Sequence, residues 1–314
     1  MIQKEKSIGY GMIFISGSLW GTIGLFVNLF NGLGAGSSLI AFLRLFIGFL
    51  LLVPIMYIMG GGRKFFLINK KSLLFCFLSG VFSQAGFNLC YTEAVGNVGV
   101  ATASVLLYTA PIFVCIMSWI FFKETIGWKK LAALAVNIVG CTLTVTGGNF
   151  STVQFSVYGV LIGIAAGFLY GLMTILSKKI SGDCPPMTIV FYSFLFGWLT
   201  MGIFSHPWES IGAIISWKFI IISIAYGIIP TAGAYLLYMK GLSKGLEASK
   251  VPIIASVETV VAALIGFLIF REAVGIIKIL GIACVLSSII IMNIPQNRKD
   301  SSDLKETIEK GMIA

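Results

Sequence analysis

A long internal repeat is the feature that most constrains the fold of this chain. Residues 94–145 contain an apolar stretch, a charged pair and a second apolar stretch, and residues 242–292 follow the same order. With an offset of 148 positions, the repeat aligns Phe122 with Phe270, Glu124 with Glu272, Gly127 with Gly275 and Lys130 with Lys278. A repeat of this length in an apolar chain indicates a membrane protein built from two similar halves.

The composition supports an integral membrane protein. Of the 314 residues, 58% are hydrophobic and only 11% are charged, whereas soluble domains have about 25% charged residues. A helix needs about 20 apolar residues to cross a bilayer, and the chain has room for ten such helices. We expect them at residues 8–30, 37–58, 73–95, 98–122, 128–146, 157–176, 186–204, 219–239, 249–270 and 274–294.

These ten spans form two units and a tail. We assign residues 1–147 to a first five-helix repeat, 148–294 to a second, and 295–314 to a charged cytoplasmic tail. Because five is an odd number, the second repeat enters the membrane in the opposite direction. The predicted fold class is therefore an all-α integral membrane protein with ten transmembrane helices in two inverted five-helix repeats.

The charged residues predict the orientation. The net charge is +10, and 18 of the 22 Lys and Arg residues fall in the N-terminus, the tail and the four loops expected on the same side of the membrane. The positive-inside rule then places both termini of this multi-pass cell-membrane protein in the cytoplasm. Basic residues that set topology give no support for nucleic-acid binding. The six cysteines have no metal-ligand spacing, so we expect packing residues, no metal and no cofactor.

With these features, the sequence resembles the ten-helix EamA branch of the drug/metabolite transporter superfamily over about residues 8–294. The resemblance rests on the doubled pattern TAPIFVCIMSWIFFKE and SVETVVAALIGFLIFRE, on first helices that contain LWG and LYG, and on Arg44 in helix 2. It implies a secondary transporter with a central cavity that exports amino acids, related metabolites or drugs. One departure is Glu258-Thr259, because the second repeat of the family often has Glu-Pro at this point. The resemblance therefore does not predict a helix break here.

Two polar stripes are candidates for the lining of such a cavity. Each has the spacing i, i+4, i+7, which places its members on one face of an α-helix. The stripes are Gln84, Asn88 and Tyr91 in helix 3, and Thr231, Tyr235 and Tyr238 in helix 8. They would face each other across the repeat axis, where transporters bind a small-molecule substrate near the midplane. The alternative is interhelical hydrogen bonding that only holds the bundle together.

Aromatic residues extend this set. Trp20 and Tyr170 occupy equivalent repeat positions and would either stack on substrate or pack against neighbouring helices. Tyr108 shares a helix face with Ser104 and Pro111. Pro111 cannot donate a backbone hydrogen bond, so it either frees a carbonyl for the cavity or only kinks helix 4.

Glu258 is the sharpest candidate for coupling. It lies about nine residues into helix 9, deep in the hydrocarbon, where an unpaired carboxylate is costly. It would carry a coupling proton or cation, or else form a structural pair with a hydroxyl or a lysine. Arg44 either takes part in coupling or extends its charge to the membrane surface. We interpret Glu124 and Glu272 as contacts between helices at loop ends.

Other functions are disfavoured. The chain has a single histidine, His206, and no paired carboxylates within a helix, so we do not expect an enzyme. It has no Walker A sequence for ATP. A lipid-carrier flippase or a non-transporting membrane subunit remains the alternative to a transporter, and no feature of the sequence fixes an oligomeric state.

The predicted topology can be tested with reporter fusions. Fusions after Lys70 and after Lys310 should report a cytoplasmic location, and a fusion near Asn149 should report an external one, because the basic loops alternate with neutral ones. Alkaline phosphatase fusions report external positions, and fluorescent-protein fusions report cytoplasmic ones. A cytoplasmic reading at Asn149 would remove the argument for inverted repeats.

Overall fold

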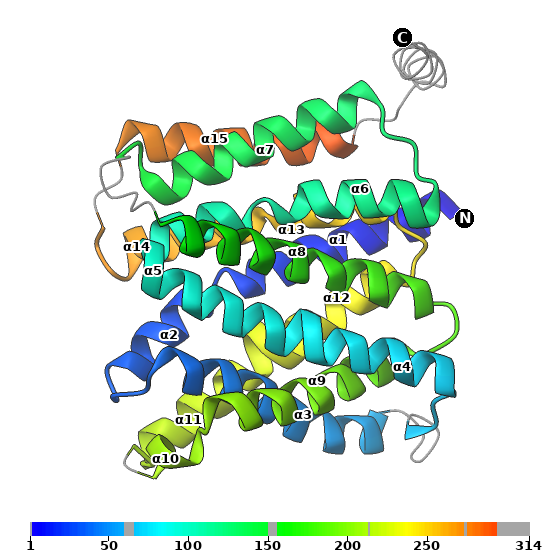
Figure 1. Cartoon of the computed structure of the whole chain (residues 1–314). Coiled ribbons are helices and arrows are strands. Elements are labelled where there is room, and N and C mark those ends of the chain that lie inside the picture. The colour runs from blue at the N-terminus through cyan, green and yellow to red at the C-terminus, as the bar shows by residue number, and fades with distance from the viewer. Residues whose placement is uncertain (1, 60–65, 150–155, 213, 273–274, 294–314) are drawn as a thin grey trace.

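The computed structural model describes residues 2–59, 66–149, 156–212, 214–272 and 275–293, so the predicted tail lies outside the described residues (Figure 1). The first repeat contains α1 (Ile2–Trp20), α2 (Ile23–Asn31), α3 (Ser37–Met59), α4 (Lys70–Leu78), η2 (Ser79–Gly86), α5 (Phe87–Leu107), α6 (Ala110–Phe122) and α7 (Trp128–Thr146). The second contains α8 (Val157–Ile180), α9 (Pro186–Ser205), α10 (Trp208–Ile211), α11 (Trp217–Tyr226), η4 (Gly227–Gly233), α12 (Ala234–Leu242), η5 (Ala248–Lys250), α13 (Val251–Ala255), α14 (Val257–Leu268) and α15 (Ile276–Asn293).

These helices give the ten crossings that the sequence predicts. In the described part of the chain, nine helical runs are long and apolar enough to span a membrane, and Ala110–Phe122 is a shorter apolar helix. One run, Lys70–Leu107, holds the third crossing and the first half of the fourth, because the chain turns back at Gly99. The φ of Gly99 is 76°, a value that favours glycine. The predicted fold class is confirmed.

The crossings lie side by side along one common direction (Figure 1). The start of α1 and the end of α15 lie at the same end of the bundle, which we call the N-terminal end. Helices α7 and α15 pack closely against each other, and a Cβ added at Gly281 would lie 2.6 Å from the Thr144 amide nitrogen. Large apolar side chains point outward, as a lipid-facing surface requires; Ile58 is 79% exposed and Ile276 is 77% exposed.

Three of the predicted helices are interrupted, which corrects the sequence-based bounds. Helix 1 is broken between α1 and α2, helix 4 at Tyr108–Thr109, and helix 9 at Ser256. At each break a hydroxyl donates to a carbonyl oxygen three residues earlier: Thr22 to Leu19 at 2.7 Å, Thr109 to Leu106 at 2.6 Å, and Ser256 to Ile253 at 2.6 Å. Such bonds compete with the helical hydrogen-bond ladder.

The breaks in helices 4 and 9 occupy equivalent places, because the offset of 148 maps Tyr108 onto Ser256. Pro111 follows the first break and lies in the opening turn of α6, where its missing N–H is tolerated. Thr259 takes the corresponding place after the second break, and its Oγ1 donates to Ser256 O at 2.6 Å. Two different local chemistries therefore produce the same interruption.

Glycines from the first helix of each repeat pack against the break in the other repeat. Only glycine permits such close backbone approach. A Cβ added to these glycines would lie close to a carbonyl oxygen of the broken helix: 2.4 Å for Gly17 to Ala255, 2.7 Å for Gly21 to Glu258, 3.0 Å for Gly167 to Leu106, and 3.2 Å for Gly171 to Ala110. Each repeat thus covers the interrupted backbone of its partner.

Helices 3 and 8 each contain a π-helical segment, η2 and η4, and the offset of 147 places the two segments on each other. Pro230 explains part of the second one. It cannot donate to the Tyr226 carbonyl oxygen as in an α-helix, and the Thr231 hydroxyl donates to that oxygen at 2.8 Å. Short π segments within α-helices are frequent at functional sites, and Gln84 and Thr231 lie inside these two.

The close packing of the first helix can be tested with two glycine variants. Gly17→Ala should lower the midpoint of thermal unfolding, because its Cβ would lie 2.4 Å from Ala255 O and overpacking costs about 1–3 kcal/mol. Gly24→Ala is the matched control, since no atom lies within 4 Å of its added Cβ and alanine favours the helix. Circular dichroism melts in one detergent measure both, and an unchanged midpoint for Gly17→Ala would contradict the packing.

Candidate functional site

The centre of the bundle holds a buried hydrogen-bonded cluster from both repeats. The Tyr235 hydroxyl accepts a hydrogen bond from Arg44 Nη2 at 2.9 Å and donates one to Gln84 Oε1 at 3.1 Å. The Gln84 amide lies 3.5 Å from Met173 Sδ. Arg44, Gln84 and Tyr235 are all buried. The Tyr235 hydroxyl therefore bonds to both the Arg44 guanidinium and the Gln84 amide in the interior of the fold.

An aromatic group adjoins this cluster. Trp20 is buried, and its ring centroid lies 5.2 Å from that of Tyr235, 5.1 Å from Tyr238 and 6.3 Å from Tyr170. The Tyr238 hydroxyl lies 2.7 Å from Thr174 Oγ1. Trp20 Nε1 and Arg44 Nε have no hydrogen-bond partner among the described residues. Buried donors of this kind call for an explanation, and a ligand that accepts hydrogen bonds supplies one.

A second group of site residues keeps part of its surface accessible. Tyr91, Tyr108, Tyr170 and Glu258 are half-buried, and they interact electrostatically with one another deep in the fold. The Tyr91 hydroxyl lies 2.9 Å from Ser104 Oγ. Interior side chains that remain accessible border on space large enough for water. This group is less tightly enclosed than the Tyr235 cluster, and its role as the lining of a cavity stays a prediction.

Glu258 lies in the first turn of α14, two residues after the break. A helix N-terminus favours a negative charge, and the break places that N-terminus in the interior. Within the described ranges no hydrogen bond or ion pair involves the Glu258 carboxylate, and Arg44 is the cation that acts on it electrostatically. The repeat equivalent of Glu258 is Ala110, so only one of the two breaks carries a carboxylate.

The structure brings together some of the sequence-predicted stripe and separates the rest. Gln84 meets Tyr235 across the repeats, as predicted. Asn88 instead donates to the Gln84 carbonyl in its own helix at 2.6 Å, and Thr231 donates to Tyr226. Both of these bonds are made to backbone carbonyl oxygens of the residue's own helix, so these two side chains do not meet across the repeats. That any of these side chains touch substrate stays a prediction.

The sequence analysis did not identify a buried polar contact at the break in helix 9. Asn137 Nδ2 donates to Ser256 Oγ at 2.5 Å and to Ser288 Oγ at 3.0 Å, and Asn137 and Ser288 are fully buried. These contacts join α7, α15 and helix 9. An asparagine inside an apolar span was the available signal, since polar residues at membrane depth are costly and are found paired.

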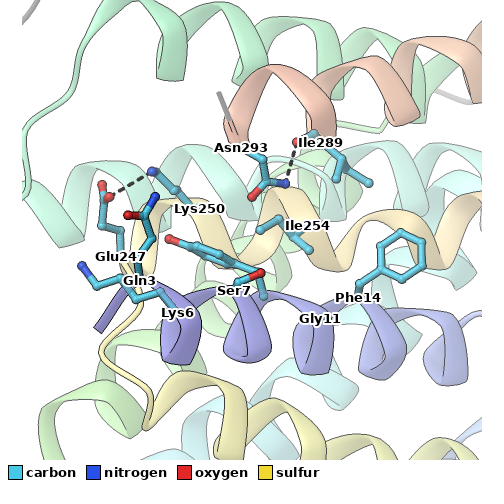
Figure 2. Close-up of a pocket in the computed structure, with 11 residues that line it drawn as sticks. Gln3, Lys6, Ser7, Gly11, Phe14, Glu247, Lys250, Ile254, Ile289 and Asn293 are labelled. Carbon is cyan, nitrogen blue, oxygen red and sulfur yellow. Dashed lines mark hydrogen bonds and ion pairs between the residues drawn. The ribbon is translucent and has the colours of Figure 1, made fainter. Parts of the chain in front are cut away.

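A separate groove of about 550 Å³ lies at the N-terminal end between α1, α13 and α15 (Figure 2). Its rim includes Lys6, Glu247, Lys250 and Asn293, and Glu247 forms an ion pair with Lys250 at 2.9 Å. None of the sequence-predicted site residues lines this groove. The central cluster and this groove are therefore in different places.

Ten apolar crossings, two inverted repeats and interior polar groups at paired helix breaks define a multi-pass membrane transporter. Two matches show its family. The EamA-like transporter family matches residues 7–146 and 157–294, one match for each repeat. The chain therefore belongs to the EamA-like transporter family.

Relatives agree with this assignment. An uncharacterized transporter of Archaeoglobus fulgidus is 29% identical over 283 residues, which cover 90% of this chain and 95% of the relative. The uncharacterized inner membrane transporter YicL of Salmonella typhimurium is 23% identical, with 91% and 95% covered. A solved crystal structure has the same fold, with a TM-score of 0.78, 16% identity, and 91% and 96% covered. Family and relatives indicate a transporter rather than an enzyme.

The packed and lining groups can be distinguished with two tyrosine variants. Tyr235→Phe should lower the thermal stability, because Gln84 Oε1 and Arg44 Nη2 lose their bonds to the Tyr235 hydroxyl, at a cost of about 1–3 kcal/mol. Tyr108→Phe should leave stability unchanged, since its hydroxyl bonds to no described residue, and should instead alter substrate affinity. Thermal melts and ligand titration of both variants test this. Equal destabilisation by the two changes would contradict the division.

Proposed function

We propose that this chain is a secondary active transporter that exports a small metabolite, amino acid or drug by alternating access, with a coupling proton carried by Glu258. The observation that carries the proposal is the Glu258 carboxylate, half-buried at an interior helix break and without an ion pair among the described residues. A carboxylate at this depth is costly and marks a functional site. Protonation removes its charge, so the broken helix could move between states at lower cost.

The surroundings support a small amphipathic substrate. The rings of Trp20, Tyr170 and Tyr238 pack on one another, so a substrate that separates them would meet apolar faces, with the unpartnered donors Arg44 Nε and Trp20 Nε1 at one end. Sites of this kind, mostly apolar with a few fixed polar groups, bind small molecules. The unpaired Glu258 offers an acceptor for a proton or for a positively charged group.

We propose that residues 1–147 and 148–294 are the two units that move relative to each other. Both termini would then face the cytoplasm, in agreement with the 18 basic residues predicted on that side. Export, rather than uptake, rests on the resemblance to the ten-helix EamA branch. The relatives are named transporters, which supports the general activity but identifies no substrate.

Glu258→Gln tests proton coupling. Glutamine keeps the size and hydrogen-bonding capacity but cannot carry the proton, so pH-driven accumulation in proteoliposomes should fall to background. Exchange of labelled substrate between equal pools should persist, because exchange needs no net proton movement. The substrate is first identified by thermal-shift screening of amino acids, nucleoside derivatives and common drugs.

Glu93→Gln is the matched control, since Glu93 is exposed and bonds only to Asn97 in its own helix at 3.1 Å. This variant should accumulate substrate like the wild type. Normal accumulation in Glu258→Gln would remove the coupling role and leave Glu258 as a structural residue. Loss of both accumulation and exchange would show instead that substrate binding needs the charge.

A further inference from the structure

A carboxylate of the first repeat holds the start of a helix in the second repeat. Glu124, in the loop after α6, accepts hydrogen bonds from the Ala248 amide at 2.7 Å, the Ser249 amide at 3.1 Å and the Ser249 hydroxyl at 2.6 Å. Lys178 Nζ, from α8, lies 2.5 Å from Glu124 Oε1. Ala248 and Ser249 begin helix 9, so Glu124 caps that helix from across the repeat boundary.

Neighbouring charges strengthen the contact. Lys130 is buried, donates to Ser249 Oγ at 3.1 Å and pairs with Glu247 at 2.5 Å. Burial raises the pKa of the Glu124 carboxyl, but hydrogen bonds from Lys178 and Ser249 outweigh burial and lower that pKa to about 2. We call the contacts of Glu124 with Lys178, Ala248 and Ser249 the first lock. It joins the two repeats at the N-terminal end of the bundle.

The equivalent loop at the opposite end has the same backbone but a different partner. Lys123 and Arg271 both adopt left-handed φ values, 53° and 55°. The amide after each bonds to an equivalent carbonyl: Glu124 to Ser118 at 3.3 Å, and Glu272 to Gly266 at 3.0 Å. The two loops therefore differ in their side-chain partners and not in their local backbone shape.

The Glu272 carboxylate makes no contact across the repeats in the described structure. It pairs with Lys278 of its own repeat at 3.1 Å and its side chain is 53% exposed, against 8% for Glu124. The offset of 148 makes Val100 and Ala101 the counterparts of Ala248 and Ser249. Val100 is exposed and follows the turn at Gly99, where the second segment of α5 starts.

We infer that Glu124 and Glu272 are paired gate residues: Glu124 closes the N-terminal end in the state described here, and Glu272 closes the opposite end in the other state by capping the amides of Val100 and Ala101. In an inverted-repeat transporter one half moves against the other about a fixed central site, so a contact that opens at one end can be matched by the equivalent contact at the other end. Opening one lock and closing the other is then a single movement. This inference rests on the alternating access of the proposed function.

The two locks are unequal. The first has the cation Lys178, whereas the offset of 150 that aligns α1 and α8 places Asn28 at the corresponding position of the second. Charge-assisted hydrogen bonds are about twice as strong as neutral ones. The first lock is therefore the stronger, and it is the lock that is formed in the described state.

Spin-label distances test the inference on the full chain in nanodiscs, in a variant whose six native cysteines are replaced. One label pair, Thr125→Cys with Ser243→Cys, spans the repeats at the N-terminal end. The other pair, Gly96→Cys with Ile276→Cys, spans them at the opposite end; all four positions are exposed. Glu124→Gln should lengthen the first distance, shorten the second and raise the population of the other state at least about tenfold.

Asn28→Lys supplies the missing cation and should shift the same two distances in the same sense, while Glu272→Gln added to Asn28→Lys should cancel that shift. Glu209→Gln, an exposed carboxylate in α10, is the control and should change neither distance. Hydrogen exchange on the protein with its native cysteines gives a second measurement. In Glu124→Gln, peptides that cover residues 100–101 should exchange more slowly, which a merely local loss of a cap at residues 248–249 would not produce.

Unchanged distances and unchanged exchange at residues 100–101 in Glu124→Gln would overturn the inference. So would a shift by Asn28→Lys that persists without Glu272. These measurements need no substrate. If the distances shift as expected but no solute accumulates in vesicles, the gate stands and the proposed export fails; if export proceeds and the distances do not respond, the reverse holds.

Discussion

In a bilayer core no water bonds to exposed backbone groups, so every interrupted helix of this fold has to be covered by other parts of the protein. Helices 4 and 9 are both interrupted near mid-span. Hydroxyl groups bond to carbonyl oxygens at each break, and glycines of the opposite repeat bring a helix backbone against it. Because each repeat covers the break of the other, neither half is complete alone, and the two-repeat fold follows from this requirement.

The same breaks determine where chemistry can occur. A helix that restarts inside the bundle has an interior N-terminus, and that terminus favours negative charge. The second repeat places Glu258 there and the first places Ala110. The backbone is therefore symmetric while the charge is not. Arg44 donates to the Tyr235 hydroxyl, and that hydroxyl donates in turn to Gln84 Oε1 in the first π segment. Site residues thus come from the irregular parts of otherwise regular helices.

The sequence predicted much of this arrangement for physical reasons. Apolar length gives the ten crossings, the small residues Gly17 and Gly21 give a close helix contact, and a lone acidic residue in an apolar span identifies Glu258. Pro111 indicated a possible kink in helix 4, but the breaks at Thr22 and Ser256 and the π segments could not be predicted, because a hydroxyl in an apolar span bonds to a backbone carbonyl in unbroken helices as well. The bond from Arg44 to Tyr235 joins residues 191 positions apart, and local patterns contain no information on such a pair.

The inequality of the two ends has a physical consequence for any inverted-repeat transporter of this kind. Two identical locks would contribute equally to the two access states, whereas one lock with a cation and one without favours a single resting state. A ligand or proton that binds both states equally cannot shift that balance; only a difference in affinity between the states can. The unpaired Glu258 and the half-buried Tyr91, Tyr108 and Tyr170 are the groups at which the proposed function places such a difference. The free energy of the first lock and the binding at the central site therefore have to be matched. A stronger first lock requires a larger difference between the affinities of the two states for the ligand or proton.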